Sequence, residues 1–119
     1  MTSKFVQEGS VINRTLAGTV ASGDVVPMRT SIGIALKSGV SGDVISVAVE
    51  GVFTVPKASA AVFAQGEKLL WDTSAGNFDD DAATPAAGDI MGAVVAMAAG
   101  ANGETTATVK LTPGNATLT

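Results

Sequence analysis

A short signal recurs along this chain: a glycine, then an acidic residue, then apolar residues. It occurs four times, at spacings of 19, 24 and 22 residues: Gly23-Asp24-Val25-Val26, Gly42-Asp43-Val44-Ile45, Gly66-Glu67-Lys68-Leu69-Leu70 and Gly88-Asp89-Ile90-Met91. Glycine accepts the positive φ of a tight turn, and an adjacent acidic residue suits the exit from that turn into a strand. The signal therefore predicts an all-β fold of short strands joined by turns.

Alternation of apolar and polar residues predicts where the strands lie. The clearest run, residues 44–55, has Gly51 in its middle, which predicts a bulge or sharp bend that divides it into two strands. Thr106 to Leu111 alternates as a half-buried strand, and Pro27 predicts that Val25 to Met28 is an edge strand. Ile90 to Ala99 is expected to be a strand despite its alanines, and Ala58 to Gln65 is the only segment that suits a helical turn.

The order of these signals predicts two similar β-units. Gly23-Asp24, Gly33 and Gly42-Asp43 in the first half resemble Gly66-Glu67, Gly92 and Gly103-Glu104 in the second. The second half carries an insertion, residues 72–89, whose Asp, Gly, Ala and Pro content predicts an exposed loop. With 119 residues, the chain is expected to hold one compact domain, residues 11–119, behind an N-terminal arm or strand, residues 1–10.

Composition excludes several classes of function. The chain has no Cys and no His, so disulfides, thiolate or imidazole metal sites and the common catalytic triads are ruled out. The net charge is −4 and the basic residues are scattered, which argues against nucleic-acid binding. No segment is long and apolar enough to predict a membrane helix. Charged residues are only 15% of the chain, so part of its surface is expected to face another protein.

Few residues suggest chemistry, and we expect no enzyme, no cofactor and no metal. The carboxylates of Asp79, Asp80 and Asp81 could bind a hard cation such as calcium, but adjacent aspartates in such a loop are usually solvated. Trp71 follows two leucines and suits a core or subunit contact. Lys57 is expected to be a surface charge.

Several blocks in order resemble the capsid cement, or head decoration, proteins of tailed bacteriophages. They are Phe5-Val6-Gln7-Glu8-Gly9, the run from Val49 to Lys57, the run from Ala64 to Asp72 with Gly76, and Gly92-Ala93-Val94-Val95 before the closing strand. The resemblance implies a β-clip or β-tulip-like domain. It also implies a homotrimer on the outer surface of the phage head, bound to the major capsid protein at three-fold and quasi-three-fold positions and stabilising the shell.

On this hypothesis the contact residues are Lys4, Phe5, Val6, Gln7, Phe53 and Trp71. The N-terminal strand would pair with an edge of the capsid protein, and surfaces bearing Trp71 or flanking Gly51 would meet in the trimer. One alternative is a virion-surface or cell-surface adhesion module whose Asp-rich loop binds a glycan or calcium, which calorimetry would detect. Another is a tail-tube or fibre subunit, which would form long polymers or elongated trimers.

Overall fold

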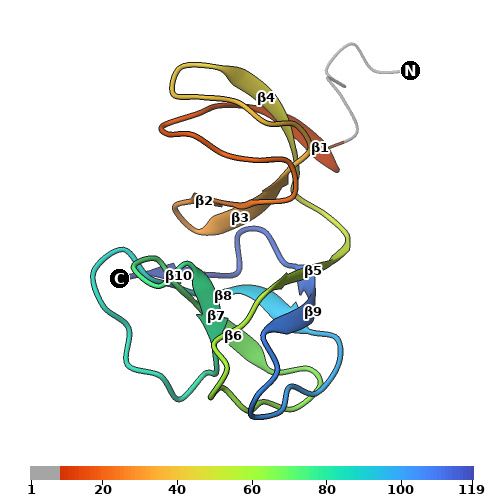
Figure 1. Ribbon diagram of the computed structural model, residues 1–119, viewed down its shortest axis with the longest axis vertical. Coiled ribbons are helices and arrows are strands. Elements are labelled where there is room, and N and C mark those ends of the chain that lie inside the picture. The colour runs from red at the N-terminus through yellow and green to blue at the C-terminus, as the bar shows by residue number, and fades with distance from the viewer. Residues whose placement is uncertain (1–8) are drawn as a thin grey trace.

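The computed structural model describes residues 9–119, which form ten strands in two antiparallel sheets (Figure 1). The first sheet has the order β1-β4-β3-β2, from β1 (Val11–Thr15), β2 (Val25–Met28), β3 (Ser31–Ala35) and β4 (Val44–Ala48). The second has the order β5-β9-β8-β6-β7, from β5 (Val52–Pro56), β6 (Lys68–Asp72), β7 (Asn77–Asp79), β8 (Ile90–Ala96) and β9 (Thr106–Leu111), with β10 (Thr117–Leu118) paired to β8. The predicted all-β class is confirmed, and β2 is an edge strand as Pro27 indicated.

Each glycine–acid signal is a turn of one construction that ends where a strand begins. The acidic residue donates its N–H to the carbonyl three residues earlier, and its carboxylate accepts the N–H of that same residue. In the first copy, Asp24 N lies 3.0 Å from Ala21 O and Ala21 N lies 2.9 Å from Asp24 Oδ2. The glycine has φ of 90–95° at all five sites: Gly23, Gly42, Gly66, Gly88 and Gly103. This is the left-handed conformation that a type II turn requires at its third position.

The two sheets repeat one arrangement of strands, as the sequence predicted. Strands β1, β2, β3 and β4 correspond in order and pairing to β5, β6, β8 and β9. The match extends to single hydrogen bonds: Gly23 N to Ala35 O, 2.7 Å, is repeated by Gly66 N to Ala96 O, 2.8 Å. The isolated bridge between Val20 and Gly39 is likewise repeated between Phe63 and Gly100.

The predicted match of Gly33 with Gly92 depends on an irregularity in the second sheet. Beyond this irregularity the pair Leu70–Met91 repeats the pair Pro27–Ile32, which makes Gly92 the counterpart of Gly33. Before it, the hydrogen bonds equate Ala35 with Ala96, which by residue count alone would give Val94. A bulge between Lys68 and Leu70 shifts the register of β6 against β8, and this irregularity has no parallel where β2 pairs with β3. Gly-to-Gly matching in the sequence could not detect that shift.

The insertion adds a strand that the first unit lacks. Most of residues 72–89 is exposed, as expected, but Asn77–Asp79 forms β7, and Phe78 within it is fully buried. Strand β7 pairs with β6 and also bridges to Lys57 at the end of β5. The second sheet is therefore curled so that its two outer strands meet at this point.

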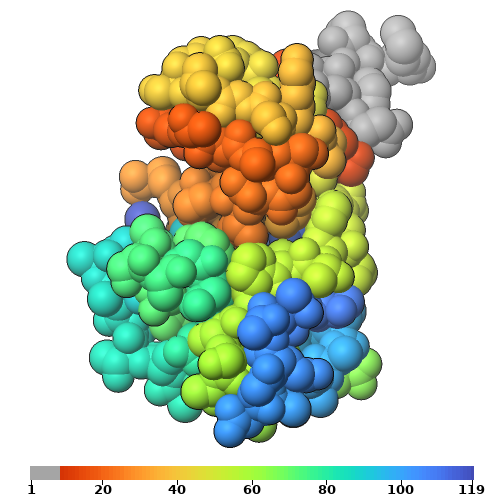
Figure 2. All heavy atoms as spheres, viewed as in Figure 1, coloured from red at the N-terminus to blue at the C-terminus, as the bar shows by residue number. Residues whose placement is uncertain are grey.

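Gly51 marks the crossing between the sheets, and the predicted division of residues 44–55 into two strands is confirmed. Before it, Ile45, Val47 and Val49 face a small core within the first sheet. After it, Val55 joins the main core, which also contains Ile32 and Ile34 from β3. The two units, stacked in Figure 2, thus share one apolar core through a face of the first sheet.

The predicted helical turn at Ala58–Gln65 was wrong, and the described residues contain no helix there. Neighbouring strands take up the hydrogen-bonding groups of this segment. Ala58 N donates to Phe78 O at 2.8 Å, and Phe63 bridges Gly100. Between these contacts Ala61 N donates to Ala58 O at 3.0 Å and closes a single turn. The long-range bonds keep the segment from continuing as a helix, which alanine alone would favour.

We predict that Gly51→Ala destabilises the protein by about 1–3 kcal/mol, because a side chain at this backbone conformation is strained. Gly51 has φ of 121°, and an added Cβ would lie 3.2 Å from the Phe53 ring. Gly18→Ala is the matched control, since no atom lies within 4 Å of its added Cβ. Urea denaturation of both variants measures the difference, and equal midpoints would show that the crossing is not strained.

Candidate protein–protein interface

The exposed large apolar side chains gather mainly on the first unit. Seven are exposed among the described residues, and four of them belong to that unit: Val11, Leu36, Val40 and Val44. The other three are Val52 at the start of β5, Val62 in a connecting loop and Leu118 in β10. Single exposed apolar residues are ordinary, so their arrangement on the sheets decides whether they form a surface.

The pairing of β1 with β4 places an uncharged face toward solvent. Because directly opposed residues share a face, Val11, Asn13 and Thr15 stand beside Ser46 and Val44. We call these five residues the first outer face. Val44 is 62% exposed and Val11 is 42% exposed, and none of the five carries a charge.

The second unit presents the equivalent face on β5 and β9. Its members, all exposed, are Val52, Thr54, Pro56, Thr106, Thr108 and Lys110, and we call them the second outer face. Lys110, directly opposite Val52, is its one charged member, and Val52 is 55% exposed. Both faces adjoin the terminal strand of their sheet, β1 or β5. A terminal strand bearing a face poor in charge and rich in β-branched residues is suited to contact with another protein chain.

The interface residues expected from sequence lie in three different environments. Lys4, Phe5, Val6 and Gln7 lie outside the described residues. Phe53 is partly buried and packs against the main core from β5, next to Val52. Trp71 is only 7% exposed and its ring lies 4.9 Å from that of Phe78, so its bulk fills the chain's own core. Trp71 therefore offers little area to a partner, and the surface that flanks Gly51 is the better candidate.

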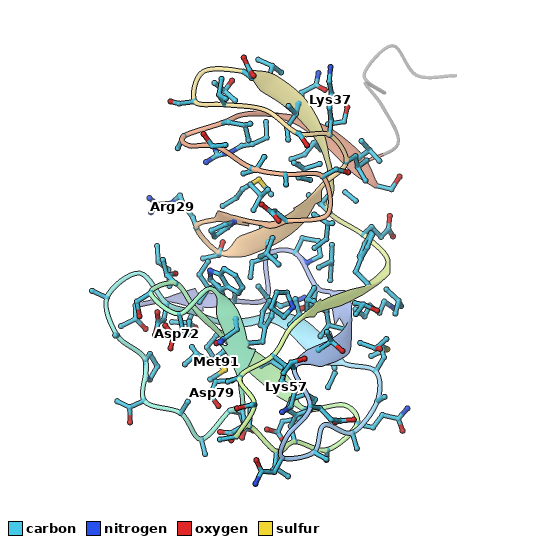
Figure 3. The ribbon with its side chains drawn as sticks, viewed as in Figure 1. Arg29, Lys37, Lys57, Asp72, Asp79 and Met91 are labelled. Atoms are coloured by element: carbon cyan, nitrogen blue, oxygen red, sulfur yellow. The ribbon has the colours of Figure 1, made fainter. Side chains whose placement is uncertain are left out.

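Lys57 is not the surface charge that the sequence suggested. It is 3% exposed, and Figure 3 shows it within the second unit, whereas Lys37 projects from the first. Its Nζ donates to the carbonyls of Ala58 at 2.8 Å, Ala101 at 3.0 Å and Glu104 at 3.1 Å. Lys57 thus links the segment after β5 to the turn before β9. Sequence reasoning missed this because its partners are main-chain carbonyls, which leave no signature in the sequence.

The acidic loop satisfies its own main chain and forms no cation site. Asp79 Oδ1 accepts the N–H of Asp80, and Glu67 Oε2 accepts the N–H of Asp81 at 3.2 Å. Loss of hydration and the nearby Glu67 carboxylate raise the pKa of Asp81, while the N–H groups of Asp81 and Ala64 lower the pKa of Glu67. Within residues 9–119, no three His, Cys, Asp or Glu side chains come together as metal ligands. The calcium alternative therefore gains no support from this part of the chain.

Comparison with known families fits the fold and these faces. The family model described as phage cement protein matches residues 6–111. The chain therefore belongs to the phage cement proteins, a family of structural virion proteins that act on the phage capsid. No curated protein matches the chain. In the part of the chain that is described, no helix has the length and hydrophobicity to cross a membrane.

We predict that Lys57→Met lowers the free energy of unfolding by about 2–3 kcal/mol, because the charged donor that Lys57 provides to main-chain carbonyls is lost. Lys37→Met is the control, since Lys37 is exposed. Chemical denaturation at neutral pH compares them. If the free energy of unfolding fell by the same small amount in both variants, the carbonyl contacts of Lys57 would not contribute to stability.

Proposed function

We propose that this chain is a cement protein that binds the outer surface of the phage head as a homotrimer, at three-fold and quasi-three-fold positions, and stabilises the shell. The family match is the observation that carries the proposal. On this proposal the chain makes and breaks no covalent bonds and needs no cofactor. It acts in the virion after assembly in the host cytoplasm.

The contact with the shell is assigned to the N-terminal arm, residues 1–10, ahead of a domain formed by residues 11–119. The arm leads directly into β1, the terminal strand of the first sheet, beside the first outer face. An edge of the major capsid protein could pair with this arm, so that main-chain hydrogen bonds provide affinity and side chains provide specificity. Residues Lys4 to Gln7 would make that pairing.

The contact between copies is assigned to the surface that flanks Gly51, namely the second outer face together with the exposed edge of Phe53. This face carries a single charge, that of Lys110, and lies on β9 and on β5, the terminal strand of the second sheet. A trimer presents three arms to the shell at once, so weak individual contacts combine through high effective concentration. Slow release from the head would follow without any large single interface.

Deletion of residues 1–7 is predicted to reduce occupancy on purified capsids about tenfold or more. Each trimer would lose the contacts of three arms with the shell, and the binding free energy of all three would be lost together. The measurement is the ratio of bound protein to capsid protein after sedimentation. Thermal unfolding of the deleted protein is the control and should match the full chain. Unchanged occupancy would refute the role of the arm.

Val52→Lys is predicted to prevent trimer formation, because it places a second positive charge directly opposite Lys110, and the contact would have to desolvate two like charges that lack a partner. Val62→Lys is the matched control, since Val62 is 58% exposed and Val52 is 55% exposed. Mass measurement in solution and maps of decorated capsids both report the oligomer, so trimers that form only on the shell are also detected. Normal trimers with Val52→Lys would exclude this face.

A further inference from the structure

A hollow of about 170 Å³ opens between the two terminal strands of the first sheet. It lies between the end of β1, the connecting residues 17–20 and β2, and we call it the β1–β2 slot. Its walls are mainly apolar and include Arg14, Leu16, Ala17, Val20, Val26 and Pro27.

The internal repeat shows what fills the equivalent gap in the second unit. There β7 lies between β6, the counterpart of β2, and the residues that follow β5, the counterpart of β1. Phe78 enters that gap and is fully buried, and its carbonyl accepts the N–H of Ala58 at 2.8 Å. The first unit has no strand in this place, because the insertion that supplies β7 occurs only in the second half.

The groups that would receive such a strand are present in the first unit. Ala17 is the counterpart of Ala58, since each is the second residue after its strand. Ala17 is exposed, and its N–H has no hydrogen-bond partner within residues 9–119. Arg14 Nε is buried and also has no partner in this part of the chain. A buried donor on a cation favours an anionic acceptor.

We propose that the β1–β2 slot binds a short extended segment of a different polypeptide, with one large apolar side chain next to an acidic residue. The apolar side chain takes the place that Phe78 has in the second unit, a main-chain carbonyl accepts the Ala17 N–H, and the carboxylate pairs with Arg14. Pro27 has no main-chain N–H, so β2 offers one donor fewer to the bound segment. The segment therefore makes few main-chain hydrogen bonds with β2, and we expect it to be short.

A second copy of the chain is the weaker candidate for the occupant. Its own segment of this kind, Asn77–Asp79, is held inside the second sheet, where Phe78 is fully buried. To place that strand in the slot of a second copy, the second sheet would have to open. The lining residues of the slot include none of the second outer face and none of residues 1–10, so this inference is argued from residues other than those of the proposed trimer contact and arm.

The test uses the full-length protein and a synthetic peptide with the sequence of residues 75–80, AGNFDD. Amide chemical shifts of the isotopically labelled protein are followed during titration with the peptide. The expected result is saturable shifts confined to residues 14–20, 25 and 26, and none with a peptide in which alanine replaces the phenylalanine. Absent shifts at millimolar peptide, shifts elsewhere, or equal shifts with the alanine peptide would overturn the proposal.

Two protein variants sharpen the test. Arg14→Gln is expected to weaken peptide binding about tenfold, whereas Arg29→Gln, which removes an exposed arginine of the same unit (Figure 3), should leave binding unchanged. Equal affinities of the two variants would remove Arg14 from the site. Self-association of the chain that disappears with Arg14→Gln would assign the slot to a second copy and so overturn the choice of a foreign chain. Because no capsid is used, these outcomes are independent of those that test the cement role.

Discussion

The turn closed by a carboxylate is the constraint on which the rest of this structure depends. In each copy the acidic side chain accepts the N–H at the start of the turn while its own N–H returns to the same residue. A charged acceptor makes such a bond stronger than one between neutral groups. The turn therefore fixes the residue at which the next strand starts, and with it which side chains of that strand face the core.

The same turns explain why the sheet faces carry little charge. Five of the eleven acidic residues stand in these turns, at strand ends and away from the sheet faces: Asp24, Asp43, Glu67, Asp89 and Glu104. Lys57, one of only seven basic residues, is buried among carbonyls. With charge concentrated at these positions, the two outer faces consist of Val, Thr, Ser, Asn and Pro, and Lys110 is their one charged residue. A face of this kind loses little hydration when another protein covers it.

Much of the fold could be predicted because its signals are local. Glycine with a positive φ beside a carboxylate is a turn wherever it occurs, and the alternation before and after Gly51 indicated two strands without any knowledge of their partners. The failures are all cases in which distant main chain decides the outcome. Ala58–Gln65 is not helical because Phe78 and Gly100 bind its main chain, and Lys57 is buried because carbonyls 44 and 47 residues away accept its hydrogen bonds. Trp71 fills the core because β7, an inserted strand, brings Phe78 against it.

The repeat is most informative where its halves differ. Leu16 and Lys57 follow equivalent strands, and both are buried, yet one closes an apolar core and the other binds carbonyls. The second half has β7 to fill the gap between β6 and the residues after β5, so this gap needs no further segment. Within residues 9–119 the first half retains a hollow at the equivalent place and a buried donor, Arg14 Nε, without a partner. The same arrangement of strands thus closes this gap with its own chain in one half and leaves it open to another polypeptide in the other.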